Sequence, residues 1–165
     1  MQDRLTSDAL AAAAAQVAAL MLARGWTLAT AESCTGGLIG HTLTDLPGSS
    51  AFYQGGVVAY SYEAKTTLVG VSQELLLAHG AVSHPVAFEL ARGVRRILGT
   101  QVGLSVTGIA GPSGGTPTKP VGTVYVAVSS PCGDETRHFV WDQDRRGNKH
   151  LSALAALELI IAQLA

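Results

Sequence analysis

The stretch Ala31-Glu32-Ser33-Cys34-Thr35-Gly36-Gly37 connects two apolar segments of different character. The segment before it, residues 26–31, is typical of a short strand, and the segment after it is typical of a helix. We therefore expect a strand-to-helix turn that carries a hydroxyl and a thiol side by side. Free N–H groups at a helix N-terminus favour negative charge, and two glycines let a ligand or another backbone come close. Such a turn suits a nucleophile.

Strand and helix patterns alternate outward from this turn. Helices are predicted over residues 7–24, 37–44, 73–78, 83–99 and 147–164, with a helical turn over 65–69. Strands are predicted over residues 27–31, 52–60, 102–106, 121–129 and 136–141, the last two joined as a hairpin by residues 130–135. This order predicts an α/β fold, a three-layer α/β/α sandwich with a mixed β-sheet, in a single domain over residues 1–165.

The composition is that of a globular protein, with 47% hydrophobic and 14% charged residues. Lys and Arg number 11 against 12 Asp and Glu, and this balance argues against a protein that binds nucleic acid by neutralising phosphates. Two cysteines are too few for a disulfide framework, which favours a reducing cytoplasm. No segment is read as a membrane span or a signal peptide, so we expect neither a membrane nor a nucleic-acid partner.

Ser33 is the first candidate nucleophile, and an isolated serine hydroxyl needs a base. Lys65 is the candidate base because it lies among apolar residues just past a strand, where burial would lower its pKa. Tyr60 and Tyr62 lie close to Lys65 in sequence and are candidates for relaying a proton or positioning the amine. Spacing alone favours a plainer alternative, in which Ser33 caps the helix and Lys65 is a solvated surface lysine.

Cys34 is the alternative nucleophile, because a helix N-terminus would lower the pKa of its thiol. Five histidines are available as bases, but none lies beside an obvious orienting carboxylate: His41, His79, His84, His138 and His150. The sequence therefore favours a role for Cys34 as a small buried hydrophobic residue.

Two further stretches are candidate ligand-binding segments. The glycine-rich loop over residues 107–115 has backbone N–H groups that can approach an anion or an oxyanion, with a plain surface loop as an equal alternative. The second stretch is the charged run over residues 142–150. Such a run is usually the solvated start of a helix, and the alternative is that Arg145 binds a phosphate of the ligand. The spacing of histidines, cysteines and carboxylates predicts no metal site.

Four motifs in order resemble one family, the CinA C-terminal domain family of nicotinamide-nucleotide amidases. They are Thr27-Leu-Ala-Thr-Ala-Glu-Ser-Cys-Thr-Gly-Gly37, Gly55-Gly-Val-Val-Ala-Tyr60 with Glu63-Ala-Lys65, Ser105-Val-Thr-Gly-Ile-Ala-Gly-Pro112 and Lys119-Pro-Val-Gly-Thr-Val124. The resemblance covers nearly the whole chain, whose length is that of the stand-alone amidase.

The resemblance implies hydrolysis of the carboxamide of nicotinamide mononucleotide (NMN) to nicotinate mononucleotide and ammonia, without a metal or cofactor. It implies Ser33 as nucleophile and Lys65 as base, with Tyr60 beside them. Substrate contacts are implied at Thr35, Gly36, Thr107, Gly108, Ala110, Gly111 and Arg145.

The chain departs from the family pattern at three positions. Gln143 replaces a common glycine, Lys149 stands where a second arginine is usual, and Tyr62 often has an asparagine in its place. Two alternatives therefore stay open: an inactive nucleotide-binding or interaction module, and an amidase for another small amide. Apolar faces on the small helices also lead us to expect a homo-oligomer.

Overall fold

The computed structural model of the protein describes the backbone of residues 2–165 and the side chains of residues 6–165. The elements follow one another along the chain as α1 (Gln2–Arg24), β1 (Leu28–Glu32), α2 (Leu38–Thr44), the 3-10 helix η1 (Ser49–Ala51), β2 (Tyr53–Val58), α3 (Tyr62–Val69), α4 (Gln73–His79), α5 (His84–Leu98), β3 (Val102–Gly108), β4 (Thr123–Ser130), β5 (Gly133–Val140) and α6 (Arg145–Leu164). Each predicted helix and strand is present.

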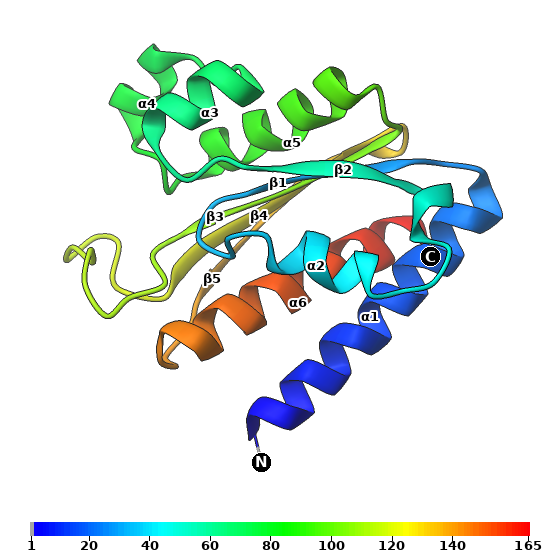
Figure 1. Cartoon of the computed structure of the whole chain (residues 1–165). Coiled ribbons are helices and arrows are strands. Elements are labelled where there is room, and N and C mark those ends of the chain that lie inside the picture. The colour runs from blue at the N-terminus through cyan, green and yellow to red at the C-terminus, as the bar shows by residue number, and fades with distance from the viewer. Residues whose placement is uncertain (1) are drawn as a thin grey trace.

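The strands form one mixed sheet in the order β2-β1-β3-β4-β5 (Figure 1). β1 pairs in parallel with both β2 and β3, whereas β4 is antiparallel to β3 and to β5. All five residues of β1 are buried, as expected for a parallel strand covered on both faces. The predicted mixed sheet is confirmed.

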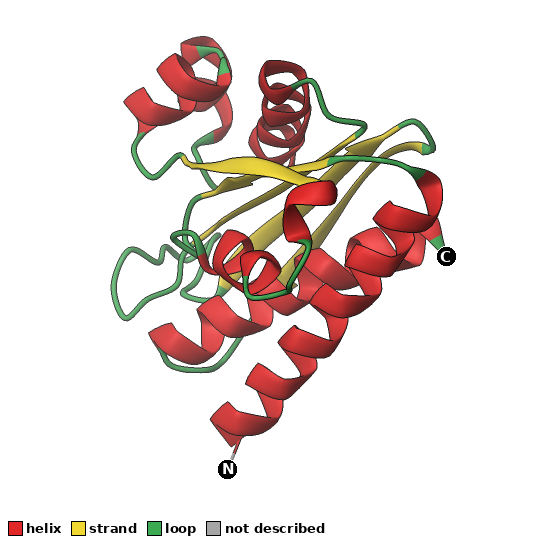
Figure 2. Ribbon diagram, turned by 45° about the vertical axis from the view of Figure 1, so that its right-hand side comes forward, coloured by secondary structure: helices red, strands yellow, loops and turns green. Residues whose placement is uncertain are grey.

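Helices cover both faces of the sheet, which confirms the three-layer α/β/α sandwich. α1, α2 and α6 lie on one face, with α1 and α6 side by side, and α3, α4 and α5 lie on the other (Figures 1 and 2). The first layer encloses the larger apolar cluster, to which Val17, Leu104 and Leu157 contribute. That residues 1–165 form a single domain stays a prediction.

Several element boundaries differ from the sequence prediction, among them the start of α1 at Gln2 and of α3 at Tyr62, and two of the differences have a clear cause. Only Pro131 and Cys132 connect β4 to β5, because the polar residues of β5, such as Asp134, lie on a half-exposed strand that carries no strong apolar signal. α6 begins at Arg145 rather than at residue 147, because the Asp144 side chain accepts a hydrogen bond from the N–H of Gly147 and caps the helix. Ser72 caps α4, because its side chain accepts a hydrogen bond from the N–H of Leu75.

By length and composition alone, the stretch Thr6–Arg24 of α1 is apolar enough to cross a membrane, so the prediction that no segment qualifies was wrong. The stretch is 28% buried in the structure, and Leu10 and Met21 on it belong to the core. A helix that packs in a core passes the same test, so this finding is by itself a weak indication of a membrane span.

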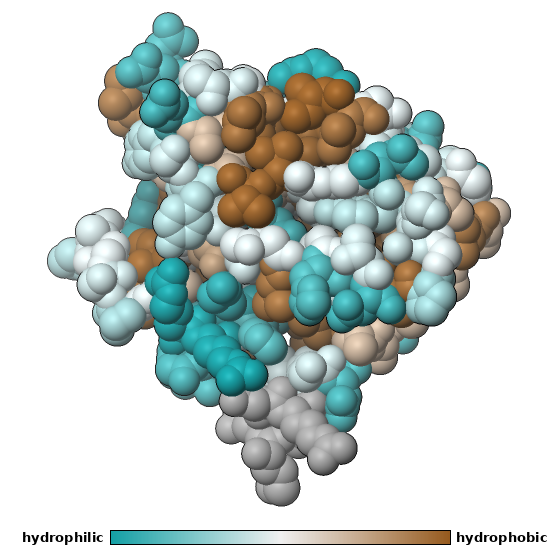
Figure 3. Space-filling view, viewed as in Figure 1, coloured by the Kyte–Doolittle hydropathy of each residue, from teal (hydrophilic) through white to brown (hydrophobic). Residues whose placement is uncertain are grey.

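Hydrophobic side chains gather on the surface where β2 and the C-terminal end of α5 lie (Figure 3). Val58 on β2 is 49% exposed, and Ile97 and Leu98 on α5 are 45% and 38% exposed. β2 is an edge strand of the sheet, so one of its sides has no strand partner in the described chain. The homo-oligomer that we expected stays a prediction.

Candidate active site

Ser33 directly follows β1, at the point where the strand order reverses. β2 lies on one side of β1 and β3 on the other, and ligands of open α/β sheets bind at the carboxyl ends of strands at such a point. The N–H of Ser33 donates to the carbonyl of Val106 on β3 at 2.9 Å. On the other side, the N–H of Ala59 donates to the carbonyl of Glu32 at 2.8 Å. Hydrogen bonds from both sides therefore hold the backbone at Glu32 and Ser33 in place.

The carboxylate of Glu32 occupies the N-terminus of α2. It is 2% exposed and accepts from the N–H groups of Gly37, Ile39 and Gly40 at 3.0, 3.1 and 2.8 Å. Our expectation that these donors would favour negative charge at the nucleophile was therefore wrong. Sequence reasoning assigned no role to Glu32, although a carboxylate just before a helix start is a capping signal.

The cap residue of α2 is Gly37, not Ser33. Gly36 and Gly37 have φ angles of 66° and 95°, a left-handed conformation that glycine adopts without strain. The chain needs this conformation to turn from β1 into α2. The alternative in which Ser33 acts as a helix cap is thereby excluded, and the Ser33 hydroxyl is left for another partner.

That partner is Lys65 on α3. The Nζ of Lys65 lies 3.0 Å from the Oγ of Ser33, and Lys65 is 1% exposed, so the alternative of a solvated surface lysine was wrong. Nζ also donates to the main-chain oxygens of Ala59 at 2.7 Å and Tyr60 at 3.2 Å. Each of the three neighbours of the amine is an uncharged oxygen.

Burial gives Lys65 a neutral form that is populated near neutral pH. Burial lowers the pKa of Lys65 from 10.5 to about 8, because the charged form loses its hydration. A neutral amine has two N–H bonds and one lone pair. With the carbonyls of Ala59 and Tyr60 accepting the two hydrogens, the lone pair is left facing the Ser33 hydroxyl. This is the arrangement that a general base requires.

Cys34, the alternative nucleophile, lacks the properties that a nucleophile needs. It is 5% exposed, and burial raises the pKa of its thiol from 9.0 to about 12. A thiol with so high a pKa carries almost no thiolate at neutral pH. The sulfur also lies against Gly108, where an added Cβ would be 3.1 Å from Sγ. The expectation that Cys34 is a small buried hydrophobic residue is confirmed.

A cavity of about 200 Å³ opens beside the Ser33–Lys65 pair. Its lining includes seven of the predicted site residues, namely Ser33, Tyr60, Lys65, Thr107, Gly108, Ala110 and Arg145, together with Ala81 and Val82, which sequence reasoning missed. The Thr107 hydroxyl donates to the carbonyl of Ala81 at 2.8 Å, so it positions the wall of the cavity. Gly80, which ends α4, and Ser83, which precedes α5, were the sequence signals near this wall.

Arg145 crosses the mouth of this cavity. Its Nη1 donates to the carbonyl of Gly111 at 2.7 Å, and its Nη2 donates to the Tyr60 hydroxyl at 3.1 Å. Tyr60 therefore contacts Lys65 through its main-chain carbonyl and not through its hydroxyl. The Tyr62 hydroxyl accepts a hydrogen bond from the N–H of Ala81. A proton relay through either tyrosine hydroxyl has no contact in the structure to support it.

A second cavity, of about 790 Å³, adjoins the first and shares Ala110 and Arg145 with it. α6 contributes Arg146, Lys149 and His150 to its lining, and Leu38 contributes an apolar wall. The Lys149 amine lies near the nucleophile turn, 3.7 Å from a Cβ built on Gly36. The charged run before and within α6 is thus part of a cleft and not only a solvated helix start.

Asn148 is a site residue that sequence reasoning missed. It is 1% exposed, its Nδ2 donates to the carbonyl of Ala110 at 3.1 Å, and its Oδ1 accepts from the N–H of Gln143. It therefore ties α6 to the loop that lines both cavities. Asn148 lies within the charged run over residues 142–150, so no local pattern marks it as buried.

Backbone donors for an oxyanion differ from those expected. The N–H of Ile109 is taken by the carbonyl of Thr123, whereas Gly108 lies opposite Val124 at a position of the antiparallel pair where the two residues exchange no backbone hydrogen bond. Within the described part of the chain, no oxygen accepts from the N–H of Cys34 or Thr35, although the backbone of Cys34 makes a hydrogen bond to its own sulfur. The Thr35 hydroxyl is buried and has no hydrogen-bond partner, and Thr35 lines neither cavity. Its predicted substrate contact stays a prediction, as do those of Gly36 and Gly111.

No group of three or more metal-ligating side chains that could hold an ion occurs among the residues that the structure describes.

The chain is similar over most of its length to CinA-like proteins of two bacteria. The CinA-like protein of Salinibacter ruber is 55% identical over 136 residues, which cover 82% of this chain and 33% of the relative. The CinA-like protein of Anaeromyxobacter dehalogenans is 52% identical over 144 residues, which cover 87% and 35%. The chain thus spans about a third of the length of the curated relatives that it matches.

Two solved structures have the same fold over nearly their whole length. A CinA superfamily protein from Klebsiella pneumoniae 700603 matches with a TM-score of 0.90 and 34% identity, covering 94% of this chain and 97% of that one. The competence/damage inducible protein CihA from Agrobacterium tumefaciens matches with a TM-score of 0.88 and 37% identity, covering 94% and 95%. The CinA C-terminal domain family matches residues 10–164. This chain belongs to the CinA C-terminal domain family.

Proposed function

We propose that the protein hydrolyses the carboxamide of NMN to nicotinate mononucleotide and ammonia. The observation that carries this proposal is the 3.0 Å contact between the Ser33 hydroxyl and a buried Lys65 whose pKa is lowered to about 8. A serine with a neutral lysine as its base is an arrangement for acyl transfer. The resemblance of the sequence motifs to nicotinamide-nucleotide amidases supports NMN as the substrate.

In the first half of the reaction, the Lys65 lone pair takes the proton of Ser33 as Oγ attacks the amide carbon. The resulting oxyanion needs preorganised donors, each worth about 3–4 kcal/mol. The N–H groups of Cys34 and Thr35, directly after the nucleophile, are our candidates. The protonated Lys65 then gives its proton to the departing nitrogen, the C–N bond breaks, and ammonia leaves an acyl ester on Ser33.

In the second half, water attacks the ester carbon while Lys65 takes one of its protons. Collapse of the second tetrahedral intermediate breaks the bond to Oγ, and Lys65 returns the proton to Ser33. One water is consumed, and the acid and ammonia are the products. Lys65 is restored to the neutral form in which it began.

The two adjoining cavities support a substrate with a carboxamide at one end and an anionic group at the other. The cavity of about 200 Å³ beside Ser33 is of a size for a planar carboxamide ring. The cavity of about 790 Å³ carries Arg145, Arg146 and Lys149, whose charges suit a phosphate. We place the ribose phosphate of NMN there.

Ammonia release from NMN tests the proposal directly. We expect Ser33→Ala to lower kcat by at least about a thousandfold and Lys65→Ala by about 10²–10⁴-fold. Cys132→Ser, which changes an exposed residue in the β4–β5 turn, is the matched control and should keep full activity. Full activity in Ser33→Ala would refute the nucleophile, and full activity in Lys65→Ala at pH 7 would refute the base.

A substrate panel separates this function from its alternatives. We expect nicotinamide riboside and nicotinamide, which lack the phosphate, to react with a kcat/KM at least about tenfold lower than that of NMN. NMN that binds and raises the melting temperature without ammonia release would indicate an inactive binding module. Equal turnover of all three would indicate an amidase that does not recognise the phosphate. Cytoplasmic location and a homo-oligomeric state remain part of the proposal.

A further inference from the structure

A third cavity, of about 530 Å³, lies at the opposite end of the sheet from Ser33. Its lining comes from the end of α5, the start of the segment leading into β3, the end of β4 and the start of β5, and it shares no residue with the two cavities of the active site. Strand β3 runs between the two ends and rises about 3.3 Å per residue, so they are roughly 20 Å apart. This cavity is therefore a separate site.

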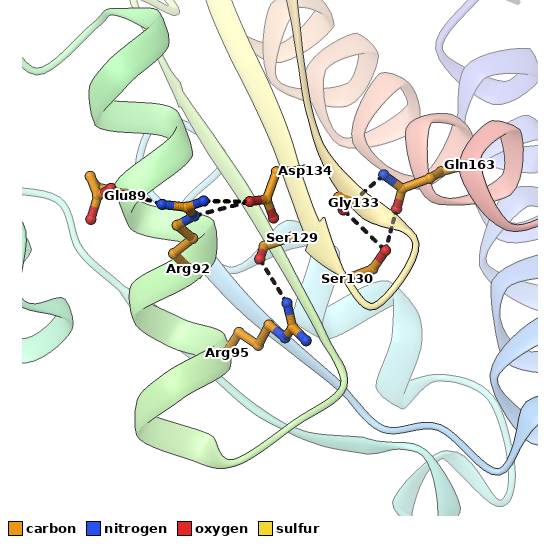
Figure 4. Close-up of polar contacts among 8 residues, drawn as sticks. All are labelled: Glu89, Arg92, Arg95, Ser129, Ser130, Gly133, Asp134 and Gln163. Carbon is orange, nitrogen blue, oxygen red and sulfur yellow. Dashed lines mark hydrogen bonds and ion pairs between the residues drawn. The ribbon is translucent and has the colours of Figure 1, made fainter.

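Three arginines on α5 line it: Arg92, Arg95 and Arg96. Arg92 is neutralised, because its Nε and Nη2 donate to Oδ2 of Asp134 at 3.0 and 2.8 Å, and Glu89 lies 4.0 Å from its Nη1 (Figure 4). Arg95 and Arg96 have no carboxylate partner in the described part of the chain. Two guanidinium charges of the described chain therefore have no carboxylate partner: that of Arg95 is bonded to Ser129 in the cavity lining, and that of Arg96 reaches the carbonyl of Val69 on α3 at 3.4 Å.

Arg95 is held in place over the sheet. Figure 4 shows it reaching from α5 toward Ser129 on β4, where its Nη1 donates to Oγ at 3.1 Å. Ser129 is 2% exposed. Arg95 lies close to β3 because Gly103 has no side chain: a Cβ there would be 2.7 Å from Cβ of Arg95. Basic residues in the last turn of a helix commonly serve the helix dipole, but that role does not require such a fixed position.

The wall opposite α5 is also fixed. The Ser130 hydroxyl donates to Oε1 of Gln163 at 2.7 Å, and Nε2 of Gln163 donates to the carbonyl of Gly133 at 3.1 Å (Figure 4). These bonds tie the end of the β4–β5 hairpin to α6. Ser129 and Asp134, which lie beside the bonded residues, are therefore presented to the cavity by a braced hairpin.

We infer that this cavity is a second anion site that binds the phosphate group of a small phosphate monoester. Guanidinium groups match the oxygens of a phosphate in geometry and charge, and Arg95 and Arg96 offer two of them. The cavity is larger than one phosphate needs and lies within the range of small-molecule sites. Asp134 has one carboxylate oxygen outside its bond to Arg92, and that oxygen can accept from a hydroxyl of the ligand.

Amide chemical shifts of the ¹⁵N-labelled protein test this inference, with inorganic phosphate and ribose 5-phosphate as separate probes. We expect saturable shifts at Gly99, Thr100 and Ser129 at probe concentrations of about 1 mM. Ribose 5-phosphate should bind more tightly than phosphate if Asp134 accepts from a hydroxyl. Equal affinity would identify free phosphate as the ligand chemistry.

Variants decide where the probes bind. Arg95→Gln and Arg96→Gln should each weaken binding by roughly tenfold or more. Arg137→Gln removes an arginine paired with Glu135 on β5, outside the cavity, and should leave binding unchanged. Arg96 is exposed and its one bond, to the carbonyl of Val69, is 3.4 Å long, so its variant should fold even if that of Arg95 does not. Absence of saturable shifts, or equal binding by Arg96→Gln and the unchanged protein, would overturn the inference.

Discussion

The lowered pKa of Lys65 determines how the activity of the site should depend on pH. Because burial lowers its pKa to about 8, Lys65 is about one tenth neutral at pH 7 and about nine tenths neutral at pH 9. Only the neutral form accepts the Ser33 proton. We therefore expect kcat/KM for ammonia release to rise about tenfold per pH unit below pH 7, to bend near pH 8 and to level above pH 9. A profile that is flat between pH 6 and 9 would contradict the assignment of Lys65 as base.

Glu32 shows how a residue without contact to the substrate can set the position of the nucleophile. Its carboxylate accepts three N–H groups of α2. In Glu32→Gln an NH₂ group replaces one of the two carboxylate oxygens, and this group faces N–H donors of α2 that it cannot accept from. We expect a loss of about 1–3 kcal/mol in the free energy of unfolding, because buried donors lose their acceptor.

The same variant should lower kcat more than it raises KM, because the turn moves Ser33 relative to Lys65 but leaves the cleft of α6 unchanged. Urea unfolding and steady-state kinetics measure the two effects. Glu135→Gln, which removes an exposed ion pair with Arg137, is the control and should change the stability by less than about 0.5 kcal/mol. Unchanged kcat in Glu32→Gln would show that α2 does not position the nucleophile.

Sequence reasoning at this scale found the residues whose chemistry is local and missed those whose role depends on distant contacts. The motif over residues 31–37 and the apolar surroundings of Lys65 made both members of the pair candidates, and the resemblance to the family favoured them over the plainer alternative. Their 3.0 Å separation across 32 residues of chain could not be predicted, since it depends on how β2 and α3 turn. Asn148 was missed because its partners, Ala110 and Gln143, come together only in the folded chain.

The ends of a helix were predictable where the sequence carries residues that start or stop helices. Ser72, Pro85 and Gly99 mark helix ends in the sequence, and each lies at such an end in the structure. The loop between β4 and β5 was predicted too long, because β5 begins at Gly133 and its pairing with β4 continues through polar residues. Tertiary pairing therefore decides the ends of β4 and β5, which local propensity does not.

The packing of α5 on β3 depends on Gly103. A Cβ at this position would lie 2.1 Å from the carbonyl oxygen of Ala91, which is backbone and cannot rotate away. We expect Gly103→Ala to lower the free energy of unfolding by about 3 kcal/mol or more, because α5 must move from the sheet. Thermal and urea unfolding measure the loss.

Gly99→Ala is the matched control for this prediction. Gly99 has a φ of 63° at the end of α5, and no atom lies within 4 Å of an added Cβ. Backbone strain is then the one source of destabilisation, and we expect Gly99→Ala to lower the free energy of unfolding by about 1 kcal/mol. If Gly103→Ala were as stable as Gly99→Ala, the close contact of α5 with β3 would not be a determinant of the fold.

At the scale of the whole molecule, the sheet separates two charged sites. The Ser33–Lys65 pair lies where β1 and β3 end, and the cavity of Arg95 lies where β3 begins. The order of elements predicted the α/β sandwich, because alternating strands and helices allow few other arrangements. It did not predict the second cavity, which needs the end of α5 and the β4–β5 hairpin to meet.

This separation predicts that the two sites act independently. The Debye length at physiological ionic strength is about 8 Å, less than half of the roughly 20 Å between the sites, so the charge of Arg95 should not shift the pKa of Lys65. We expect Arg95→Gln to keep kcat/KM for NMN within about twofold of the unchanged protein, with the same bend near pH 8. Arg145→Gln, which changes the mouth of the active site, should raise KM for NMN and leave phosphate binding at the Arg95 cavity unchanged. A shifted pH profile in Arg95→Gln, or NMN turnover that depends on ribose 5-phosphate, would instead show that β3 couples the two ends of the sheet.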